Sequence, residues 1–180
     1  MDNPTRSGDI ILRGPTATDG GALHRLVADC SPLDTNSRYC NLLQCYHFAD
    51  TAVIAEWRDN SEHPPTLAGA VTGYRLPAQP SVLFVWQVAV HPRARGLGVA
   101  KAMLGELIAR CNPRGVTHLH TTITAANDAS WALFRAVANT LDAPLTSELA
   151  FGEAQHFEGV HDSEYWVRLG PFSPISPRAS

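Results

Sequence analysis

Apolar positions recur with two periods along this chain, and each period predicts a different kind of element. Runs of alternating or continuous apolar residues predict strands at 9–13, 51–57, 66–76, 81–90, 117–124, 144–151 and 164–169. Apolar residues spaced three and four apart predict helices within 17–30, 31–45, 98–110 and 127–141. The alternation of strands and helices predicts an α/β fold with a mixed sheet.

Residues that cap helices or form turns set the limits of these elements. Polar residues that accept hydrogen bonds from a first helical turn precede three of the helices. These candidate caps are Thr18 or Asp19, Asn36 or Ser37, and Asn127 or Asp128. Residues 58–65 predict a turn, 77–81 a second break and 152–163 a polar loop. The nearly continuous apolar stretch 81–90 predicts a central strand buried on both faces.

Length and composition place these elements in one domain. The chain has 180 residues, of which 44% are hydrophobic and 17% charged, as in a globular protein with a substantial core. We expect a flexible N-terminus at 1–8, one domain over 9–170 and a flexible, Pro/Ser-rich tail at 171–180. The net charge of -3 provides no basic field, which argues against nucleic acid as a partner.

No stretch of the sequence has the length and apolar character of a transmembrane segment. The longest apolar stretch, 82–90, contains Gln87 and is far shorter than the roughly 20 residues that span a bilayer. The polar N-terminus has no apolar signal-peptide core, so we expect a cytoplasmic protein with no membrane partner. The four cysteines have neither CxxC nor zinc-site spacing and are expected to be buried or inert thiols.

The segment HPRARGLGVAKAML (91–104) lies between the predicted central strand and the helix that follows it. The start of a helix offers N–H groups and a partial positive charge to an anion. Gly96 and Gly98 would let a phosphate approach the backbone, and Arg93 and Arg95 would add charge and donors. A solvated turn with surface arginines explains the same residues, so the local chemistry leaves both interpretations open.

The spacing in this turn excludes two common nucleotide-binding motifs and fits a third. The last glycine of G-x-G-x-x-G would fall at Lys101, and no G-x-x-x-x-G-K-[ST] is present. Arg95, Gly98 and Ala100 fit [Q/R]-x-x-G-x-[G/A], and the segment resembles motif A of the GNAT superfamily of N-acetyltransferases. Together with its flanking elements the resemblance extends over residues 9–170. It implies a single-domain GNAT-like fold, with a central mixed, mostly antiparallel twisted sheet flanked by helices, and a homodimer.

This resemblance also implies that acetyl-CoA is the co-substrate and that the turn wraps its pyrophosphate. Backbone groups of residues 88–90 would hold the acetyl and pantetheine arms, and Asn127 would contact the pantetheine. Phe134 stands near the position where many members have a tyrosine that protonates the leaving thiolate. The residues implied in cofactor binding are Val88, Ala89, Val90, Arg93, Arg95, Gly96, Leu97, Gly98, Val99, Ala100, Asn127 and Phe134.

Three further stretches resemble one family within that superfamily. Residues 31–56, the strand around 86–87 and residues 155–170 are similar to the acetyltransferases that act on L-2,4-diaminobutyrate in ectoine biosynthesis, a route to osmoprotection. The resemblance implies acetyl transfer to the side-chain (γ) amino group of this small molecule. An N-acetyltransferase for another small amine or a protein amine, and a non-catalytic acyl-CoA-binding module, remain as alternatives.

Acidic and aromatic side chains in the matching stretches suit a substrate with two ammonium groups. The substrate residues that we expect are Asp34, Tyr39, Trp86, His156, Glu158 and Trp166. A structural explanation exists for several of them: Trp86 and Trp166 as core residues, Asp34 as a helix cap and Glu158 as a solvated loop residue.

Only a neutral amine attacks a thioester, so a base or a water relay must take the proton of the substrate ammonium. Asp34, Glu158 and His156 are the candidate bases, and a backbone N–H around Val88 is the expected stabiliser of the oxyanion. Phe134 cannot donate a proton, so water or another residue would protonate the leaving thiolate. We expect direct transfer without an acyl-cysteine, because no cysteine lies in the motifs.

The histidines of the chain predict no metal site. His156, Glu158, His161 and Glu164 do not have the spacing of a standard zinc site. His118 and His120 alternate on a predicted strand, where we expect ordinary polar packing.

Overall fold

A computed structural model of the chain describes residues 10–31, 33–58 and 66–173. Its strands are β1 (Ile10–Arg13), β2 (Val53–Trp57), β3 (Leu67–Leu76), β4 (Gln79–Val90), β5 (His118–Thr124), β6 (Leu145–Phe151) and β7 (Glu164–Leu169). Its α-helices are α1 (Gly20–Ala28), α2 (Arg38–Tyr46), α3 (Val99–Cys111), α4 (Asp128–Thr140) and α5 (Glu153–His156). Short 3-10 helices are η1 (Ala17–Asp19), η2 (Ala49–Thr51), η3 (Pro92–Ala94) and η4 (Asn112–Arg114).

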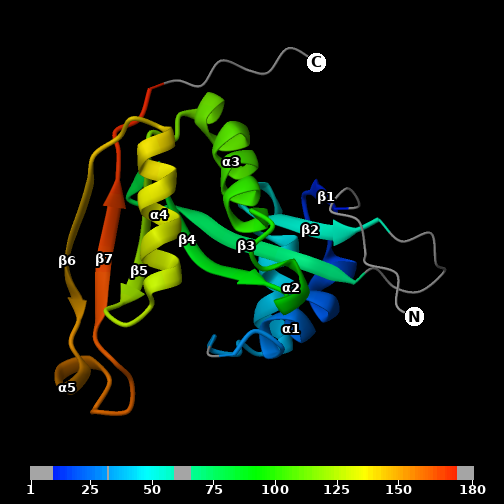
Figure 1. The fold of residues 1–180 in the computed structure, drawn as a ribbon, viewed down its shortest axis with the longest axis horizontal. Coiled ribbons are helices and arrows are strands. Elements are labelled where there is room, and N and C mark those ends of the chain that lie inside the picture. Colours follow the sequence, from blue (N-terminus) through cyan, green and yellow to red (C-terminus); the bar gives the residue numbers. More distant parts are fainter. Residues whose placement is uncertain (1–9, 32, 59–65, 174–180) are drawn as a thin grey trace. The chain divides into compact units, whose positions relative to one another are not determined.

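The strands of the described residues pair in the order β1-β2-β3-β4-β5-β7-β6 (Figure 1). β4 and β5 run parallel, whereas the registers of β1 with β2, β2 with β3, β5 with β7 and β6 with β7 are antiparallel. The predicted mixed, mostly antiparallel sheet is therefore confirmed. None of the helices within the described residues is long and apolar enough to cross a membrane.

The chain forms two compact units, and β3 and β4 each run through both of them. The first unit contains residues up to Gly73 together with Gln87–Leu107, and the second contains Tyr74–Trp86 and the residues from Ile108 onward.

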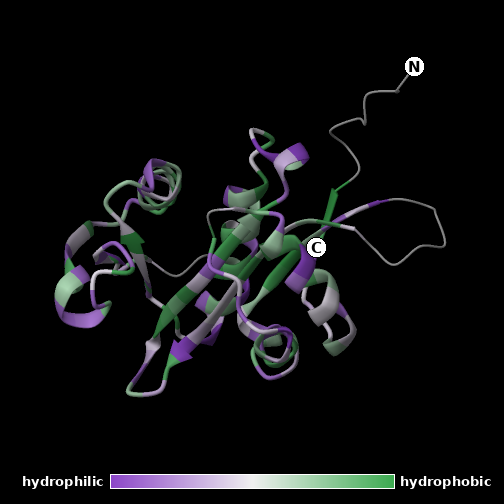
Figure 2. Ribbon diagram, turned by 90° about the horizontal axis from the view of Figure 1, so that it is seen from below, coloured by the Kyte–Doolittle hydropathy of each residue, from purple (hydrophilic) through white to green (hydrophobic). Residues whose placement is uncertain are grey.

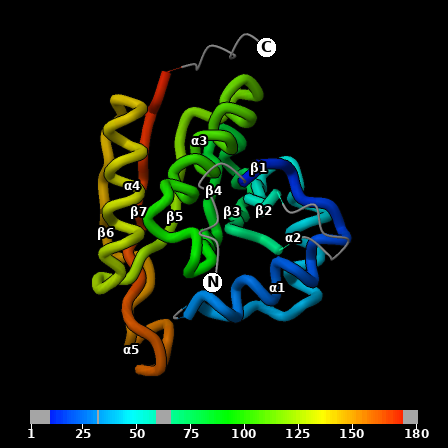
Figure 3. The backbone as a smooth tube through the Cα atoms, turned by 45° about the vertical axis from the view of Figure 1, so that its right-hand side comes forward, coloured from blue at the N-terminus to red at the C-terminus, as the bar shows by residue number. Residues whose placement is uncertain are grey.

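In the first unit, helices α1 and α2 pack against β2, β3 and β4, and Figure 3 shows the two helices side by side. The buried residues of this cluster are Leu23, Leu26, Val27, Cys30, Cys45, Ile54, Leu67, Ala70 and Ala89. Gly69, the neighbour of Ala70 on β3, lies against α3, since a Cβ there would be 2.8 Å from Met103 Cε. Neighbouring strand residues point to opposite faces. Helices α1 and α2 therefore cover one face of β3, and α3 covers the other.

In the second unit, α4 lies along β5 and β7 (Figure 1). The buried residues between them are Leu119, Ile123, Phe134, Val137, Val167 and Leu169. The other face of these strands carries half-buried polar and aromatic residues, among them His120, Trp166 and Arg168. Figure 2 shows hydrophobic colour along much of the strands and alternating colour on the helices, as expected of helices with one buried face.

The helix starts agree with the predicted caps at two places. Ser37 caps α2, and its side chain accepts a hydrogen bond from Cys40 N at 3.1 Å. Asn127 caps α4 in the same way, accepting from Ser130 N at 3.1 Å. Asp19 precedes α1 but makes no side-chain cap there. Its carboxylate is instead paired with the Arg13 guanidinium at 2.8 Å.

Two sequence predictions about β4 are wrong. The break predicted at 77–81 is a turn at 77–78, and β4 already begins at Gln79. Pro80 is tolerated because it stands at the very start of the strand, where a missing N–H costs little. The strand is also not buried on both faces, since Trp86 is 45% exposed and Val88 is half-buried. In the second unit the face that carries Trp86 lies opposite the face covered by α4.

The chain after β6 also differs from the prediction. The polar loop predicted at 152–163 contains the short helix α5. Within the predicted tail, Phe172 is buried and its N–H donates to Thr117 O at 2.9 Å. The flexible N-terminus predicted at 1–8 and most of the turn at 58–65 lie outside the described residues, as do the tail residues from 174 onward.

Candidate functional site

The turn after β4 is built from a short 3-10 helix followed by two glycines. His91 N donates to Ala68 O at 2.9 Å, which fixes the end of β4 against β3. The His91 side chain then accepts a hydrogen bond from Arg93 N at 3.2 Å and caps η3. Ala94 is only 1% exposed, so the turn is anchored in the core of the first unit before it turns outward.

Gly96 and Gly98 give this turn its shape. Their φ angles are +78° and +74°, a conformation that side-chain-bearing residues rarely adopt. A Cβ added at either glycine would meet nothing within 4 Å, so the space beside both is open. Ala102 N donates to Gly98 O at 3.0 Å as α3 begins. The N–H groups of the first turn of α3 have no partner within the helix and carry its positive end, which suits an anion.

The two arginines of the turn are oriented differently. Arg95 Nε donates to Val90 O at 3.4 Å, and the thiol of Cys30 donates to the same carbonyl at 3.3 Å. Burial raises the pKa of the Cys30 thiol, although the nearby Arg95 opposes the shift. The thiol therefore stays protonated and acts as a donor. Arg93 lies over the Trp57 ring, 5.9 Å from its centroid.

β4 extends beyond the residues that pair with β5. The parallel register contains the pairs Val82–His118, Leu83–Leu119 and Phe84–His120, whereas β4 continues to Val90. Within the part of the chain that the structure describes, Val88 has no ladder partner on β5. A backbone N–H in that situation can serve a developing oxyanion.

The segment between α1 and α2 is linked to β4 through the side chain of Gln87. Gln87 Nε2 donates to Asp34 O at 3.0 Å, and Asn36 Nδ2 donates to Gln87 Oε1 at 3.3 Å. The side chain of Asp34 is exposed, and Tyr39 in the first turn of α2 is 69% exposed. The first unit therefore links Asp34 to the residue that precedes Val88.

The two tryptophans of the predicted substrate site lie on the same face of the sheet in the second unit. Trp86 contacts Tyr74 with ring centroids 6.1 Å apart, and Tyr74 contacts Phe84 at 5.2 Å. Trp166 contacts Phe84 at 6.0 Å and Phe151 at 5.8 Å. These contacts form an aromatic surface that runs from β3 to β6, and such a surface suits an ammonium group.

The loop after β6 presents His156 and Glu158. His156 Nδ1 accepts a hydrogen bond from Gly152 N at 2.9 Å, so a neutral ring carries its proton on Nε2. Glu158 is exposed and has a φ of +52°, which is uncommon for a residue with a side chain. Backbone strain of this kind concentrates in functional loops.

Asn127 and Phe134 both belong to the start and middle of α4 in the second unit. The Asn127 side-chain oxygen caps the helix, so its NH2 group can donate to another acceptor. A contact with the pantetheine would use such a donor. Phe134 is 2% exposed and packs in the apolar core beside Val137 and Ala138. Contacts of either residue with acetyl-CoA remain predictions.

Each unit thus brings together part of the predicted site. The first unit contains Asp34, Tyr39 and the stretch from Val88 to Ala100, and the second contains Trp86, Asn127, Phe134, His156, Glu158 and Trp166. Sequence reasoning missed the roles of Gln87 and Cys30. The sequence did contain one indication for Gln87: a polar residue inside an otherwise apolar strand needs hydrogen-bond partners when its amide is withdrawn from water.

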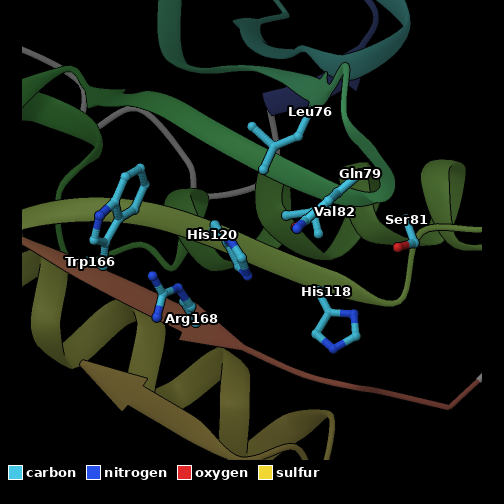
Figure 4. A pocket seen from close by; sticks show the side chains of 8 residues that line it. All are labelled: Leu76, Gln79, Ser81, Val82, His118, His120, Trp166 and Arg168. Atoms are coloured by element: carbon cyan, nitrogen blue, oxygen red, sulfur yellow. The ribbon is translucent and has the colours of Figure 1, made fainter. Parts of the chain in front are cut away.

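A hollow of about 560 Å³ opens on the same sheet face of the second unit (Figure 4). Its lining residues are Leu76, Gln79, Ser81, Val82, His118, His120, Trp166 and Arg168. Burial lowers the pKa of His120, and the nearby Arg168 and His118 lower it further. The ring centroids of His118 and His120 lie 6.4 Å apart in an edge-to-face arrangement. Among the described residues no group of three His, Cys, Asp or Glu side chains could hold a metal ion.

Comparison with known proteins adds to this geometry. A sequence model of the acetyltransferase (GNAT) family matches residues 22–138. The chain is 46% identical over 166 residues to the L-2,4-diaminobutyric acid acetyltransferase of Methylotuvimicrobium alcaliphilum, covering 92% of this chain and 93% of that protein. It is 45% identical over 159 residues to the protein of that name from Vibrio cholerae, covering 88% of each chain. A diaminobutyrate acetyltransferase from Paenibacillus lautus, solved in complex with its substrate L-2,4-diaminobutyric acid and coenzyme A, superposes with a TM-score of 0.82 at 36% identity, covering 93% of this chain and 99% of that one.

Proposed function

We propose, since this chain belongs to the acetyltransferase (GNAT) family, that it transfers the acetyl group of acetyl-CoA to the side-chain (γ) amino group of L-2,4-diaminobutyrate. The product is Nγ-acetyl-L-2,4-diaminobutyrate, and the reaction is a step of ectoine biosynthesis. The observation that carries the proposal is the close similarity to a solved acetyltransferase whose structure holds this substrate together with coenzyme A.

The turn after β4 supports the cofactor half of the proposal. Two left-handed glycines leave open space beside the first turn of α3, where N–H groups and the helix dipole attract an anion. The Arg95 guanidinium stands at the same turn and adds charge-assisted donors. We place the pyrophosphate there, and the acetyl and pantetheine arms along Val88–Val90.

The chemistry begins with a proton transfer. An alkyl ammonium has a pKa of about 10, so a base must take its proton at neutral pH. Asp34, Glu158 and His156 are the candidates, acting directly or through water. The second ammonium of the substrate lowers the pKa of the reacting one, because like charges oppose each other.

The neutral amine then attacks the thioester carbonyl carbon. A new N–C bond forms, and the carbonyl oxygen becomes an oxyanion that the N–H of Val88 stabilises. Collapse of this intermediate breaks the C–S bond and releases the coenzyme A thiolate, while the attacking nitrogen loses its remaining extra proton, which water carries to the thiolate. The thiol of coenzyme A has a pKa of about 8.5, so the thiolate is a good leaving group. Water protonates it here, since Phe134 stands near the position where many family members have a tyrosine for this step.

The proposal also covers where the enzyme acts and how it assembles. We place the enzyme in the cytoplasm, where it serves osmoprotection as a homodimer without nucleic-acid or membrane partners. The net charge of -3, which provides no basic field, supports the part of this proposal that concerns nucleic acid.

Turnover of the purified full chain with acetyl-CoA and L-2,4-diaminobutyrate tests the proposal. Release of coenzyme A is followed by thiol detection, and NMR of the product gives the acetylated nitrogen. Ornithine, lysine and spermidine serve as parallel acceptors. We expect a strong preference for diaminobutyrate with acetylation at the γ nitrogen. Preference for another amine would indicate the broader N-acetyltransferase, and coenzyme A binding without turnover of any amine would indicate a binding module.

A further inference from the structure

We propose that Gln87 is a positioning residue for the acceptor amine, because its side chain holds residues 34–36 against β4 and thereby sets where Asp34 stands. The inference rests on the proposed acetyl transfer, in which Asp34 binds the substrate ammonium or takes its proton. Gln87 itself acts through this segment and contributes no reacting atom.

Both ends of the Gln87 amide bond to the same short segment. Nε2 donates to the carbonyl of Asp34 at 3.0 Å, and Oε1 accepts from Nδ2 of Asn36 at 3.3 Å. Gln87 is half-buried beside Ala89, which is 1% exposed, so its amide is partly withdrawn from water. Buried amides need partners for both ends, and here one three-residue stretch supplies them from 53 and 51 positions away in sequence.

The chemistry of the partners fixes which way this amide points. A carbonyl only accepts hydrogen bonds, so the atom facing Asp34 O has to be the Nε2 donor. The Nδ2 group of Asn36 only donates, so it has to face Oε1. A glutamate at 87 would present two acceptors and place a negative charge against the Asp34 carbonyl. A leucine of similar size would remove both bonds.

The segment that Gln87 holds lies outside any helix or strand. It follows α1 and ends at Ser37, the cap of α2. Residues without ladder or helix bonds depend on side-chain contacts for their placement, and they shift at low cost when such contacts are lost. Loss of the Gln87 bonds would therefore loosen residues 34–36 while leaving the helices on either side in place.

Gln87 lies next to Val88, whose backbone N–H we propose as the oxyanion donor. Gln87 directly precedes Val88, and successive Cα atoms are about 3.8 Å apart. One short piece of β4 thus carries both the oxyanion donor and the group that positions Asp34. The pyrophosphate turn has its own supports, through His91, Ala94 and the first turn of α3. Changes at Gln87 should therefore affect the amine and spare acetyl-CoA.

Steady-state kinetics of Gln87→Glu test this separation. We expect the KM for diaminobutyrate to rise about tenfold, because the variant loses a hydrogen bond and leaves a carbonyl facing a like partial charge. The KM for acetyl-CoA should stay within twofold of the wild type. Asn139→Asp is the matched control, since it makes the same amide-to-acid change at an exposed position of α4 that has no assigned role, and it should leave both KM values unchanged.

A double-mutant cycle and hydrogen exchange provide independent readouts. Asn36→Ala should raise the KM for diaminobutyrate in the wild type and have no further effect in Gln87→Leu, because the bond is already gone there. Amide exchange in peptides that cover 34–37 should become faster in Gln87→Glu, while peptides from α4 keep the wild-type rate. Unchanged KM values would overturn the inference, and unchanged exchange at 34–37 would show in addition that Gln87 does not hold this segment.

These readouts also separate the inference from the proposed function. If the wild type acetylated another amine, the proposed substrate would be wrong, and the KM comparison would be made with that amine. If the wild type acetylated nothing, the exchange experiment would still decide whether Gln87 holds the segment. Normal turnover of diaminobutyrate by Gln87→Glu with a wild-type KM would reject the positioning role alone.

Discussion

Replacing Gly98 by alanine should weaken both the fold and the binding of acetyl-CoA, whereas the same replacement at Gly105 should do neither. Gly98 has a φ of +74° at the start of α3, and Gly105 is an exposed residue in the middle of that helix. No atom lies within 4 Å of a Cβ added at either position. The pair therefore differs in backbone conformation and not in available space.

The two substitutions should shift stability in opposite directions. An alanine in the left-handed region destabilises the folded state by about 1–2 kcal/mol. Alanine also lowers the conformational entropy of the unfolded chain, which offsets about 0.4–1 kcal/mol of this loss. Gly98→Ala should therefore lose about 1 kcal/mol of unfolding free energy. Alanine inside a helix is favoured over glycine by roughly 0.5–1 kcal/mol. In a chain of this size about 1 kcal/mol corresponds to roughly 2–4 °C in Tm, so Gly98→Ala should melt lower and Gly105→Ala higher.

Thermal unfolding and the KM for acetyl-CoA, measured on both variants, check this expectation. If alanine relaxes residue 98 out of the left-handed region, the N–H groups at the start of α3 turn away from the pyrophosphate. The KM for acetyl-CoA should then rise severalfold in Gly98→Ala and stay constant in Gly105→Ala. Equal Tm shifts of the same sign would refute the conformational argument. A wild-type KM for Gly98→Ala would refute the assignment of this turn to the pyrophosphate.

Further expectations concern a buried acid, the thiols, the turn and the core. Burial raises the pKa of Asp19, but hydrogen bonds from its arginine and threonine partners outweigh this and lower it below the usual 3.8. Asp19→Asn should cost about 2 kcal/mol at pH 7, and the wild-type advantage, full above about pH 4, should shrink as urea denaturation is repeated at lower pH. Only half-buried Cys40 should react with a thiol reagent in the native protein, because the other three cysteines are buried; counting labelled thiols before and after unfolding tests this. Arg95→Ala should raise the KM for acetyl-CoA at least about tenfold, with Arg95→Lys intermediate in initial-rate assays. Phe134→Tyr should lower Tm without raising kcat, because its hydroxyl would enter an apolar core; a gain in kcat would show that this position reaches the thiolate.

The features that the sequence predicted correctly depend on short stretches of chain. Ser37 and Asn127 cap their helices because the cap and its N–H partner are three residues apart. The turn after β4 was predictable because two glycines separated by one residue, between an apolar strand and a helix, require an unusual backbone. The break predicted at 77–81 failed for a related reason. Two prolines in five residues indicate a loop locally, yet the start of a hairpin strand tolerates one of them.

The features that were missed depend on pairs of residues far apart in sequence. Nothing near Gln87 in the sequence indicates that residues 34–36 supply both partners of its amide. The exposure of Trp86 follows from which sheet face α4 covers, and an apolar run of ten residues does not carry that information. Glu158 adopts a positive φ in the turn that follows α5, although its residue type does not predict one.

The energetics of the two proton transfers explain why placing Asp34 matters more than the missing tyrosine. Deprotonating an amine with a pKa of about 10.4 at pH 7 costs roughly 4.6 kcal/mol, since each pKa unit is worth about 1.36 kcal/mol. A thiolate whose conjugate acid has a pKa of about 8.5 lies only roughly 2 kcal/mol above the thiol at that pH. A general acid at position 134 therefore addresses the smaller of the two barriers, and a core phenylalanine there is compatible with catalysis. The larger barrier falls on the base and on the groups that position it, and we propose Gln87 as one such group for the candidate base Asp34.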